Sequence, residues 1–412
     1  MIPPSAPLAC AVAEPIAAFA IARLPRIVFG EGALADLPKE AAALGRSLLL
    51  VTGARSFRSG PHRTTLLEAL TGAGIAVEEI AVEGEPSPEM VDAAVSSFAG
   101  RGIDVVAGIG GGSALDAAKA IAGLLPHGHS VMRHLEGVGP EQPYRGPSLP
   151  LILAPTTAGT GSEATKNAVL SRHGKAGFKK SFRDEQLVAR VAIVDPELLV
   201  SCPPEVVAAN GMDAFTQLLE SFVSIKCTPF TDALCWSGIE AFVQGFFAAY
   251  AGGEGAEARA GRTRMAYAAL LSGICLAQTG LGSVHGLASP LGAQFPIPHG
   301  VCCGTLVADA TRINLRSLRQ RLPGSPALPK YARVGALLAG DGQHGTNAEA
   351  ADRLVDLLGN WTERLALPRL SAYGMGEGDL ALVIADSRGS SMKTNPLVLT
   401  DAEIEELLRA RL

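Results

Sequence analysis

The sequence of 412 residues lacks several features that would assign it to a broad class at once. Its seven cysteines form no CxxC pair, and its 35 Lys and Arg residues form no basic block beside 40 Asp and Glu residues. The lack of paired cysteines argues against a cysteine-based zinc site. The net charge of −5 argues against nucleic acid and anionic membranes as partners. We expect free thiols in a reducing cytoplasm.

The sequence also lacks a membrane span, an internal repeat and a low-complexity tract. No stretch of about 20 apolar residues is present. The first 22 residues are apolar, but they have no basic segment at their start, and Glu14 and Pro15 interrupt them. We therefore interpret residues 1–22 as an N-terminal extension that is neither a signal peptide nor a membrane anchor.

The length and patterning predict two domains, because 412 residues exceed what one core usually holds. In residues 23–196, short apolar runs such as 47–53 and 74–82 alternate with helical segments such as 87–102. This alternation predicts an α/β domain with an open parallel sheet. Residues 197–412 contain almost only helical patterns, so we expect a second, all-helical domain there, with a capping box from Thr400 to Glu403.

The stretch "GIGGGSALD", residues 108–116, follows an apolar run and precedes a helical pattern. Three consecutive glycines let a backbone approach a pyrophosphate, which would lie at the N-terminus of the following helix. The stretch is neither GxGxxG nor a P-loop ending in GK[ST]. It therefore predicts a nucleotide-binding turn, and the alternative is an ordinary tight turn between a strand and a helix.

The stretch "APTTAGTGSEAT", residues 154–165, is rich in hydroxyl groups and glycine. Such a loop offers hydroxyls and backbone N–H groups at close range, which suits a nicotinamide or phosphate pocket. A solvated surface loop is the alternative.

Two histidines and one aspartate predict a metal site. Asp213 lies four residues before Gln217, so the two side chains share one face of a predicted helix. His285 and His299 lie in an apolar stretch that is interrupted by prolines at 290, 296 and 298. We expect these prolines to place the two imidazoles on different segments. One carboxylate and two imidazoles suit Fe²⁺, Zn²⁺ or Mn²⁺.

Seven stretches together resemble the iron-containing (group III) alcohol dehydrogenase family. They are "RIVFGEGALADLP", "GIGGGSALDAAKAIA", "PTTAGTGSEAT", "VAIVDPELL", "GMDAFTQLLE", "VHGLASPLGAQFPIPHG" and "SSMKTNPLVLTDAEI", in the family's order. The resemblance covers nearly the whole chain after residue 23. It implies an N-terminal dinucleotide-binding α/β domain and a C-terminal helical domain, with the active site between them.

The resemblance also implies roles for individual residues. The pyrophosphate turn would comprise Gly110, Gly111, Gly112 and Ser113, with Asp116 as an acid near the cofactor. The nicotinamide side would comprise Thr156, Thr157 and Thr160. Lys179 would reach the cofactor, although the adjacent Lys180 leaves the register open. The metal would be held by Asp213, His285 and His299, three of the family's four ligands.

Two positions depart from the family pattern. Gln217 occupies the position of a ligand histidine, and we expect it to serve as a weak fourth ligand, because an amide oxygen is neutral. Ser289 occupies the position of a proton-relaying histidine, so the proton would pass through water, a ribose hydroxyl or Ser289 itself. We interpret both as properties of a branch of the family.

The end of the early strand bears on the choice between NAD and NADP. Members that prefer NAD often carry an acid there, which would repel a 2′-phosphate. Here the strand ends at Gly53, and Arg55, Ser56 and Arg58 follow it. These residues could receive a 2′-phosphate, which favours NADP over NAD. The alternative is that they are exposed turn residues.

The resemblance implies a metal-dependent, NAD(P)-linked alcohol dehydrogenase or aldehyde reductase, with Fe²⁺ or Zn²⁺. Hydride would pass between the nicotinamide and an alcohol or carbonyl held at the metal.

A keto-acid reductase resembling maleylacetate reductase, with little metal dependence, is one alternative. It would require cationic contacts, and "GLGSVHGLASPLGAQFPIPHG" contains no Lys or Arg. Sugar-phosphate cyclisation or glycerol-phosphate oxidation would also require basic residues. A non-catalytic nucleotide-binding protein is the alternative from another class. The family suggests a homodimer.

Overall fold

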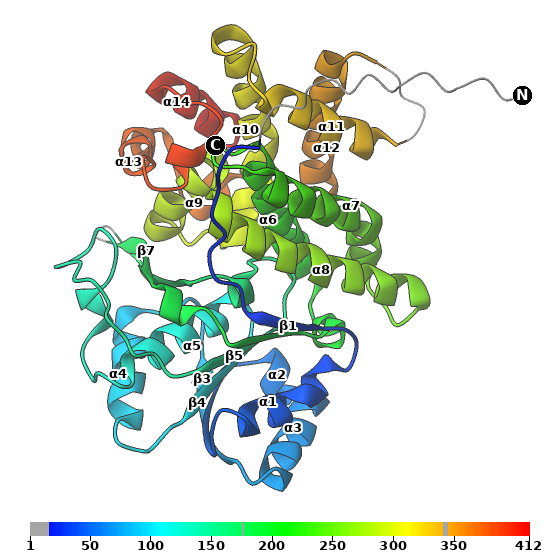
Figure 1. The fold of residues 1–412 in the computed structure, drawn as a ribbon. Helices are drawn as coiled ribbons and strands as arrows, with labels where there is room; N and C mark the ends of the chain where they lie inside the picture. The colour runs from blue at the N-terminus through cyan, green and yellow to red at the C-terminus, as the bar shows by residue number, and fades with distance from the viewer. Residues whose placement is uncertain (1–15, 175–176, 341–344) are drawn as a thin grey trace, which may run out of the picture.

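A computed structural model describes residues 16–174, 177–340 and 345–412 of the chain. Most of the predicted N-terminal extension, together with Cys10, lies outside the described residues. Figure 1 shows a sheet with flanking helices in the first half of the chain and a group of helices in the second half. The predicted fold class is therefore confirmed.

Six parallel strands form the main sheet, in the order β1-β8-β5-β4-β2-β3. Parallel strands are buried on both faces and consist of continuous apolar runs, as predicted for residues 47–53. The strands are β1 (Arg26–Phe29), β2 (Ser47–Gly53), β3 (Ala76–Val82), β4 (Val105–Gly110), β5 (Leu151–Pro155) and β8 (Val191–Val194).

Each face of the sheet has its own hydrophobic core, and successive residues of β2 alternate between the two. Leu48 and Leu50 pack into one core, whereas Leu49 and Val51 pack into the other. The alternation follows from the pleat of a strand. The covering helices are α1 (Leu37–Ala42), α2 (Ser56–Ser59), α3 (Pro61–Gly72), α4 (Pro88–Phe98) and α5 (Gly112–Leu124).

The second half packs around a third core, and α6 runs through its centre. The predicted capping box at Thr400 and Glu403 is present and begins the last helix. The helices are α6 (Pro204–Val223), α7 (Pro229–Ala251), α8 (Ala256–Thr279), α9 (Ser283–Gln294), α10 (His299–Arg321), α11 (Ala327–Ala339), α12 (Asn347–Arg364), α13 (Leu380–Asp386) and α14 (Asp401–Ala410).

An antiparallel pair of strands, β6 (Asn167–Arg172) and β7 (Phe178–Arg183), was not predicted from the sequence. Its residues mix charged and apolar side chains, so they lack the continuous apolar run of the main strands. The pair packs against α5 and α9 and thus connects the sheet half with the helical half.

The break between His285 and His299 is smaller than predicted. Pro290 lies inside α9 and does not end it, so only the segment with Pro296 and Pro298 separates α9 from α10. The two histidines still come from different helices, as expected. Among the described helices, none is long and apolar enough by itself to cross a membrane. The pair α8 and α9, which is bent by 98° at its junction, reaches the length and apolar composition of a membrane span only when the two helices are taken together.

Candidate metal centre and cofactor site

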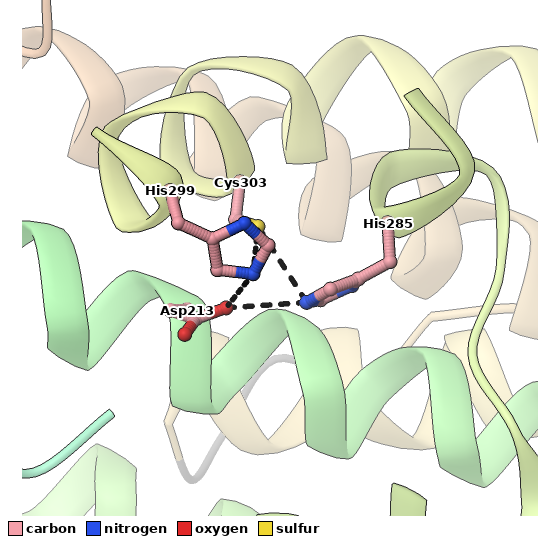
Figure 2. Close-up of side chains that lie close together, drawn as sticks. All are labelled: Asp213, His285, His299 and Cys303. Carbon is pink, nitrogen blue, oxygen red and sulfur yellow. Dashed lines mark hydrogen bonds and ion pairs between the residues drawn. The ribbon is translucent and has the colours of Figure 1, made fainter. Parts of the chain in front are cut away.

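Four side chains from three helices converge in the helical half, as Figure 2 shows. Asp213 comes from the middle of α6, and His285 from the first turn of α9. His299 is the first residue of α10, and Cys303 lies one turn later on the same helix. One donor atom from each of the four lies within 4.8 Å of the others. Three of the four predicted metal ligands, Asp213, His285 and His299, therefore lie close together, and Cys303 lies beside them.

The distances between the donor atoms suit a tetrahedral metal ion. Asp213 Oδ1 lies 3.2 Å from His285 Nε2 and 3.7 Å from His299 Nε2. The sulfur of Cys303 lies 3.5 Å and 3.8 Å from the same two nitrogens. A tetrahedral ion about 2.0–2.3 Å from each donor holds the donors about 3.3–3.8 Å apart. The residues present therefore fit a divalent ion.

An unpaired atom supports the same conclusion. Asp213 is fully buried, yet its Oδ2 has no hydrogen-bond partner among the described residues. A buried carboxylate oxygen without a partner is costly, because its desolvation is not compensated. A cation in contact with the carboxylate would compensate for this cost.

Glu220, which the sequence-based prediction missed, orients His285. Its Oε2 accepts a hydrogen bond from His285 Nδ1 at 2.7 Å, and its Oε1 accepts one from the Val284 N–H at 2.7 Å. Because Nδ1 is the donor, the lone pair of Nε2 can face the cluster. A carboxylate behind a ligating histidine is a common arrangement at metal sites.

The protonation states follow from burial and neighbouring charge. Burial, together with Lys179 and His285, lowers the pKa of His299 to about 4, so this imidazole is neutral near pH 7. Burial opposes ionisation of Asp213, but the adjacent His299 and His285 outweigh it and lower the pKa of the carboxyl. Neutral imidazole and ionised carboxylate are the forms that bind metals.

Two further groups hold protons that a metal would displace. Burial lowers the pKa of His285, but Cys303 and the hydrogen bonds to Asp213 and Glu220 outweigh it and raise that pKa well above its usual value. Burial raises the pKa of the Cys303 thiol to about 12. A bound cation would favour the deprotonated forms instead, because it stabilises a thiolate and an imidazole lone pair that coordinate it.

Gln217 and Ser289 make other contacts. The Gln217 Oε1 accepts a hydrogen bond from Ser272 of α8 at 2.6 Å, and the amide is buried. The Ser289 hydroxyl donates to the Lys179 carbonyl at 3.0 Å and so joins α9 to β7. The roles predicted for both residues stay predictions.

The glycine turn and the threonine loop lie at the carboxyl ends of neighbouring strands. Gly111 precedes α5 without any side-chain cap, so the first N–H groups of that helix face outward for an anion. The loop packs on this turn: a Cβ at Gly112 would lie 2.7 Å from Thr160, and one at Gly111 would lie 3.5 Å from Thr157. The Thr156 N–H donates to the Gly110 carbonyl at 2.9 Å. The glycine turn, with Ser113 in the first turn of α5, therefore lies in direct contact with the threonine loop.

The same loop reaches the helical half. A Cβ at Gly159 would lie 2.7 Å from Asn210, three residues before Asp213 on α6. Gly161 lies against Gly273 of α8. These contacts bring the proposed nicotinamide side next to the helix that carries Asp213.

Asp116 lies beneath the loop and serves it internally. Its Oδ1 accepts hydrogen bonds from Ser162 at 2.5 Å and from Lys119 at 3.2 Å, and its Oδ2 accepts one from the Val169 N–H at 3.1 Å. The carboxylate of Asp116, which was predicted to lie near the cofactor, thus accepts hydrogen bonds from three donors of the protein itself. This arrangement fixes the loop and β6 relative to α5.

The turn after β2 lies next to the glycine turn, because β2 and β4 are neighbours in the sheet. A Cβ at Gly110 would lie 3.0 Å from the Gly53 nitrogen. Arg55 and Ser56 are exposed and Arg58 is half-buried, and neither guanidinium has an ion pair among the described residues. Two guanidinium groups without ion pairs among the described residues therefore follow Gly53, which lies against the glycine turn.

The β6–β7 pair resolves which lysine faces the centre. Lys179 forms an ion pair with Glu85, and a Cβ at Gly292 of α9 would lie 3.7 Å from its Nζ. Lys180 points to Gly137 instead. Adjacent residues of a strand point in opposite directions, so Lys179 and not Lys180 lies against α9, the helix that carries His285. The role predicted for Lys179 stays a prediction.

Comparison with known proteins identifies the family. Residues 25–196 match the family model for iron-containing alcohol dehydrogenase, and residues 207–412 match the C-terminal model of the same family. Long-chain-alcohol dehydrogenase 1 of Geobacillus thermodenitrificans is 33% identical over 93% of this chain and 96% of its own length.

Two solved structures share the fold along the whole chain. A 1,3-propanediol oxidoreductase matches with a TM-score of 0.86 and 26% identity, covering 96% of this chain and 100% of its own. A sulfoacetaldehyde reductase of Bifidobacterium kashiwanohense in complex with NAD⁺ matches with a TM-score of 0.81 and 27% identity, covering 96% and 99%. The chain therefore belongs to the iron-containing alcohol dehydrogenase family of NAD(P)-linked oxidoreductases.

Proposed function

We propose that this chain interconverts uncharged aldehydes or ketones and their alcohols at the centre formed by Asp213, His285 and His299. The observation that carries the proposal is the convergence of the two imidazoles on Asp213 Oδ1, next to the threonine loop. The second oxygen of the same carboxylate, Oδ2, is buried and has no partner among the described residues. A divalent ion bound there would supply Lewis-acid polarisation of the substrate oxygen, and a nicotinamide cofactor would supply the hydride.

The chain's own residues would bind and orient the reactants. The α5 N-terminus and Gly110–Gly112 would hold the pyrophosphate, while Thr156, Thr157 and Thr160 would set the nicotinamide side. Asp116 would keep this loop in place through Ser162. The Ser289 hydroxyl proton is donated to the Lys179 carbonyl, so we propose that water completes any proton relay through this serine.

We propose that NADP is preferred over NAD. Arg55, Ser56 and Arg58 support this preference, because two guanidinium groups without ion pairs stand after Gly53, where an acid would repel a 2′-phosphate. The division into domains at 196/197 remains part of the proposal. Residues 23–196 would contribute the cofactor-binding residues, and residues 197–412 the metal ligands.

The substrate is proposed to be uncharged because Lys179, the lysine beside α9, is already paired. Lys179 approaches α9 but forms an ion pair with Glu85, and so presents little net charge to a carboxylate substrate. This pairing argues against the keto-diacid alternative. The convergent ligands argue against a non-catalytic nucleotide-binding protein.

A cytoplasmic location and a homodimer are also proposed. The six described cysteines are all free thiols, which is typical of reducing compartments. Support for the dimer comes from one edge of the sheet and is argued in the Discussion.

The test is a reductase assay with NADPH and with NADH on protein reloaded with Zn²⁺ or Fe²⁺. The panel would contain neutral aldehydes, a keto-dicarboxylate and a sugar phosphate, alongside metal analysis of protein purified without chelator. We expect turnover of neutral aldehydes, higher with NADPH. Failure to reduce any carbonyl with either cofactor would overturn the proposal.

Asp213→Asn tests the metal requirement directly. This change keeps the shape of the side chain but removes the charge, so we expect kcat/KM to fall about 100-fold or more. The matched control is Glu205→Gln, an exposed change on the same helix. Full activity in Asp213→Asn would show that the metal is not required.

A further inference from the structure

Asp213, His285 and His299 leave room for a fourth protein donor at the metal centre, and the family resemblance places Gln217 in that position. Asp213, His285 and His299 supply one oxygen and two nitrogens. Tetrahedral zinc sites with a full protein set have four donors. The two buried side chains that could complete the set are Gln217 on α6 and Cys303 on α10.

Gln217 is committed to another contact. Its Oε1 accepts the 2.6 Å hydrogen bond from Ser272, which also lies 3.4 Å from the Gly159 carbonyl of the threonine loop. The amide thereby links α6 to α8 beside that loop. A neutral amide oxygen that already accepts a hydrogen bond is a weak donor to a transition metal.

Cys303 has the opposite surroundings. It is fully buried, and its sulfur lies 3.5 Å from His285 Nε2 and 3.8 Å from His299 Nε2. Both imidazoles are therefore within hydrogen-bonding distance of the sulfur. Because it follows His299 by four residues on α10, both side chains project from one face of that helix.

Asp213 supplies an independent observation. Its Oδ2 is buried and unpaired, while its Oδ1 faces both histidines. Figure 2 shows the carboxylate of Asp213 and the sulfur of Cys303 approaching the two imidazoles. The cluster is therefore a set of four donors in which one carboxylate oxygen has no partner among the described residues.

We infer that the Cys303 thiolate is the fourth ligand of the metal, and that Gln217 is a structural link outside the coordination sphere. The inference rests on the proposed metal site. In this arrangement the two ligands that lie four residues apart on one helix are His299 and Cys303 of α10. The family resemblance predicts such a pair on α6, as Asp213 and Gln217. As the metal–sulfur bond forms, the thiol releases its proton to solvent.

This donor set has a consequence for metal choice. One oxygen, two nitrogens and one thiolate favour Zn²⁺ or Co²⁺ over harder ions such as Mg²⁺ and Mn²⁺. Zn²⁺ can also expand to five ligands, so four protein donors leave room for one more. We therefore expect the chain to retain zinc when equal amounts of Zn²⁺ and Mn²⁺ compete.

The experiment uses Co²⁺ as a spectroscopic probe of the full-length protein. A cobalt–thiolate bond produces a charge-transfer band in the near ultraviolet, which nitrogen and oxygen ligands do not produce. We expect this band in the unmodified protein and in Gln217→Leu, and its loss in Cys303→Ala and Cys303→Ser. Cys302→Ala is the matched control, because Cys302 is equally buried but lies outside the group of four donors.

Zinc affinity, measured by competition with a chelator, gives the second readout. Cys303→Ala should weaken zinc binding about 100-fold, while Gln217→Leu should change it less than about threefold. Thermal unfolding of the metal-free variants checks that each one folds. Cys303→Ser keeps the size of the side chain should Cys303→Ala fold poorly.

The outcomes separate this inference from the proposed function. Cobalt bound without the charge-transfer band, or a band lost in Gln217→Leu but kept in Cys303→Ala, would overturn the Cys303 assignment and leave the proposed metal site standing. If the unmodified protein binds neither cobalt nor zinc, the assignment fails together with the metal requirement, and the carbonyl assay alone then decides the reductase function.

Discussion

Among individual residues, Glu220 controls the orientation of His285. Its two oxygens accept hydrogen bonds from His285 Nδ1 and from the N–H groups of Gly282 and Val284. Glu220→Gln would replace one accepting oxygen with an amide NH₂ group, which cannot accept a hydrogen bond, so part of these hydrogen bonds would be lost. We expect zinc affinity to fall about 10–100-fold, measured by chelator competition.

Glu205→Gln serves as the control, because Glu205 is exposed near the start of the same helix. Since Glu220 is a positioning residue, the loss should appear in metal affinity even without substrate. Unchanged affinity in Glu220→Gln would show that packing alone orients the imidazole.

Glu163 predicts a pH dependence of stability. Burial raises the pKa of its carboxyl to about 7, against the opposing hydrogen bond from the backbone and the charge of Lys119. The folded protein therefore binds this proton more tightly than the unfolded chain, whose glutamates titrate near 4.3. The contribution to stability is complete below that value and is lost as the pH rises to about 7.

Glu163→Gln removes this titration. Relative to the unmodified protein, the free energy of unfolding of the variant should rise by about 3 kcal/mol between pH 4.5 and pH 7 and stay level above that. Urea unfolding of both proteins at several pH values measures the difference, and the value at low pH is the internal reference. A difference that does not change with pH would contradict the buried, protonated state of Glu163.

Among the structural elements, the turn after β2 decides the cofactor. Arg55→Ala combined with Arg58→Ala should raise the KM for NADPH about tenfold or more, because charge-assisted contacts to a phosphate are lost. The KM for NADH should change little. Arg101→Ala is the control, since Arg101 pairs with Glu78 at the edge strand β3. Equal effects on both cofactors would argue against recognition of a 2′-phosphate.

The threonine loop and α8 cross at two glycines. Gly161 has a φ of +59°, and a Cβ at Gly273 would lie 2.1 Å from its carbonyl oxygen. Gly273→Ala should therefore destabilise the protein by roughly 1–3 kcal/mol, measured as a lower Tm. Gly359→Ala is the matched control, because that helical glycine has open space around its Cα. It should be neutral or stabilising. An equal effect of both changes would show that the crossing is not tightly packed.

The elements also show which features the sequence could predict. The main strands were predictable because parallel strands are buried on both faces and so consist of apolar runs. The β6–β7 pair was missed because its charged residues obscure that pattern, and the register of Lys179 and Lys180 depended on it. Cys303 was overlooked because only CxxC spacing was considered, although it follows His299 by one helical turn.

Glu220 shows a different limit. Its carboxylate reaches His285 only because the start of α9 lies against Glu220 of α6, and no local pattern in the sequence records this contact between two separate helices. Candidate metal ligands that lie in a family motif could therefore be predicted from the sequence. The residues that support them could be identified only once the packing of the helices was known.

At the scale of the whole molecule, the two edges of the sheet differ. β3 carries Glu78 and Glu79, which pair with Arg101 and Arg63. Charged side chains protect an edge strand from pairing with another chain. The opposite edge, β1, has a sequence of RIVF, with Ile27 37% and Phe29 38% exposed. The residues before it add exposed Ile16, Phe19 and Ile21.

An open, apolar edge strand needs a partner, and a second copy of this chain would cover it by placing the same surface against itself. We therefore expect a dimer of about twice the 42.4 kDa monomer mass by light scattering. Ile27→Lys should place charge on that edge and shift the protein toward monomer as concentration falls. Val398→Lys, at a position that is 78% exposed far along the chain, should not. If Ile27→Lys stays dimeric, copies of the chain associate through another surface, and the exposed side chains of β1 require a different explanation.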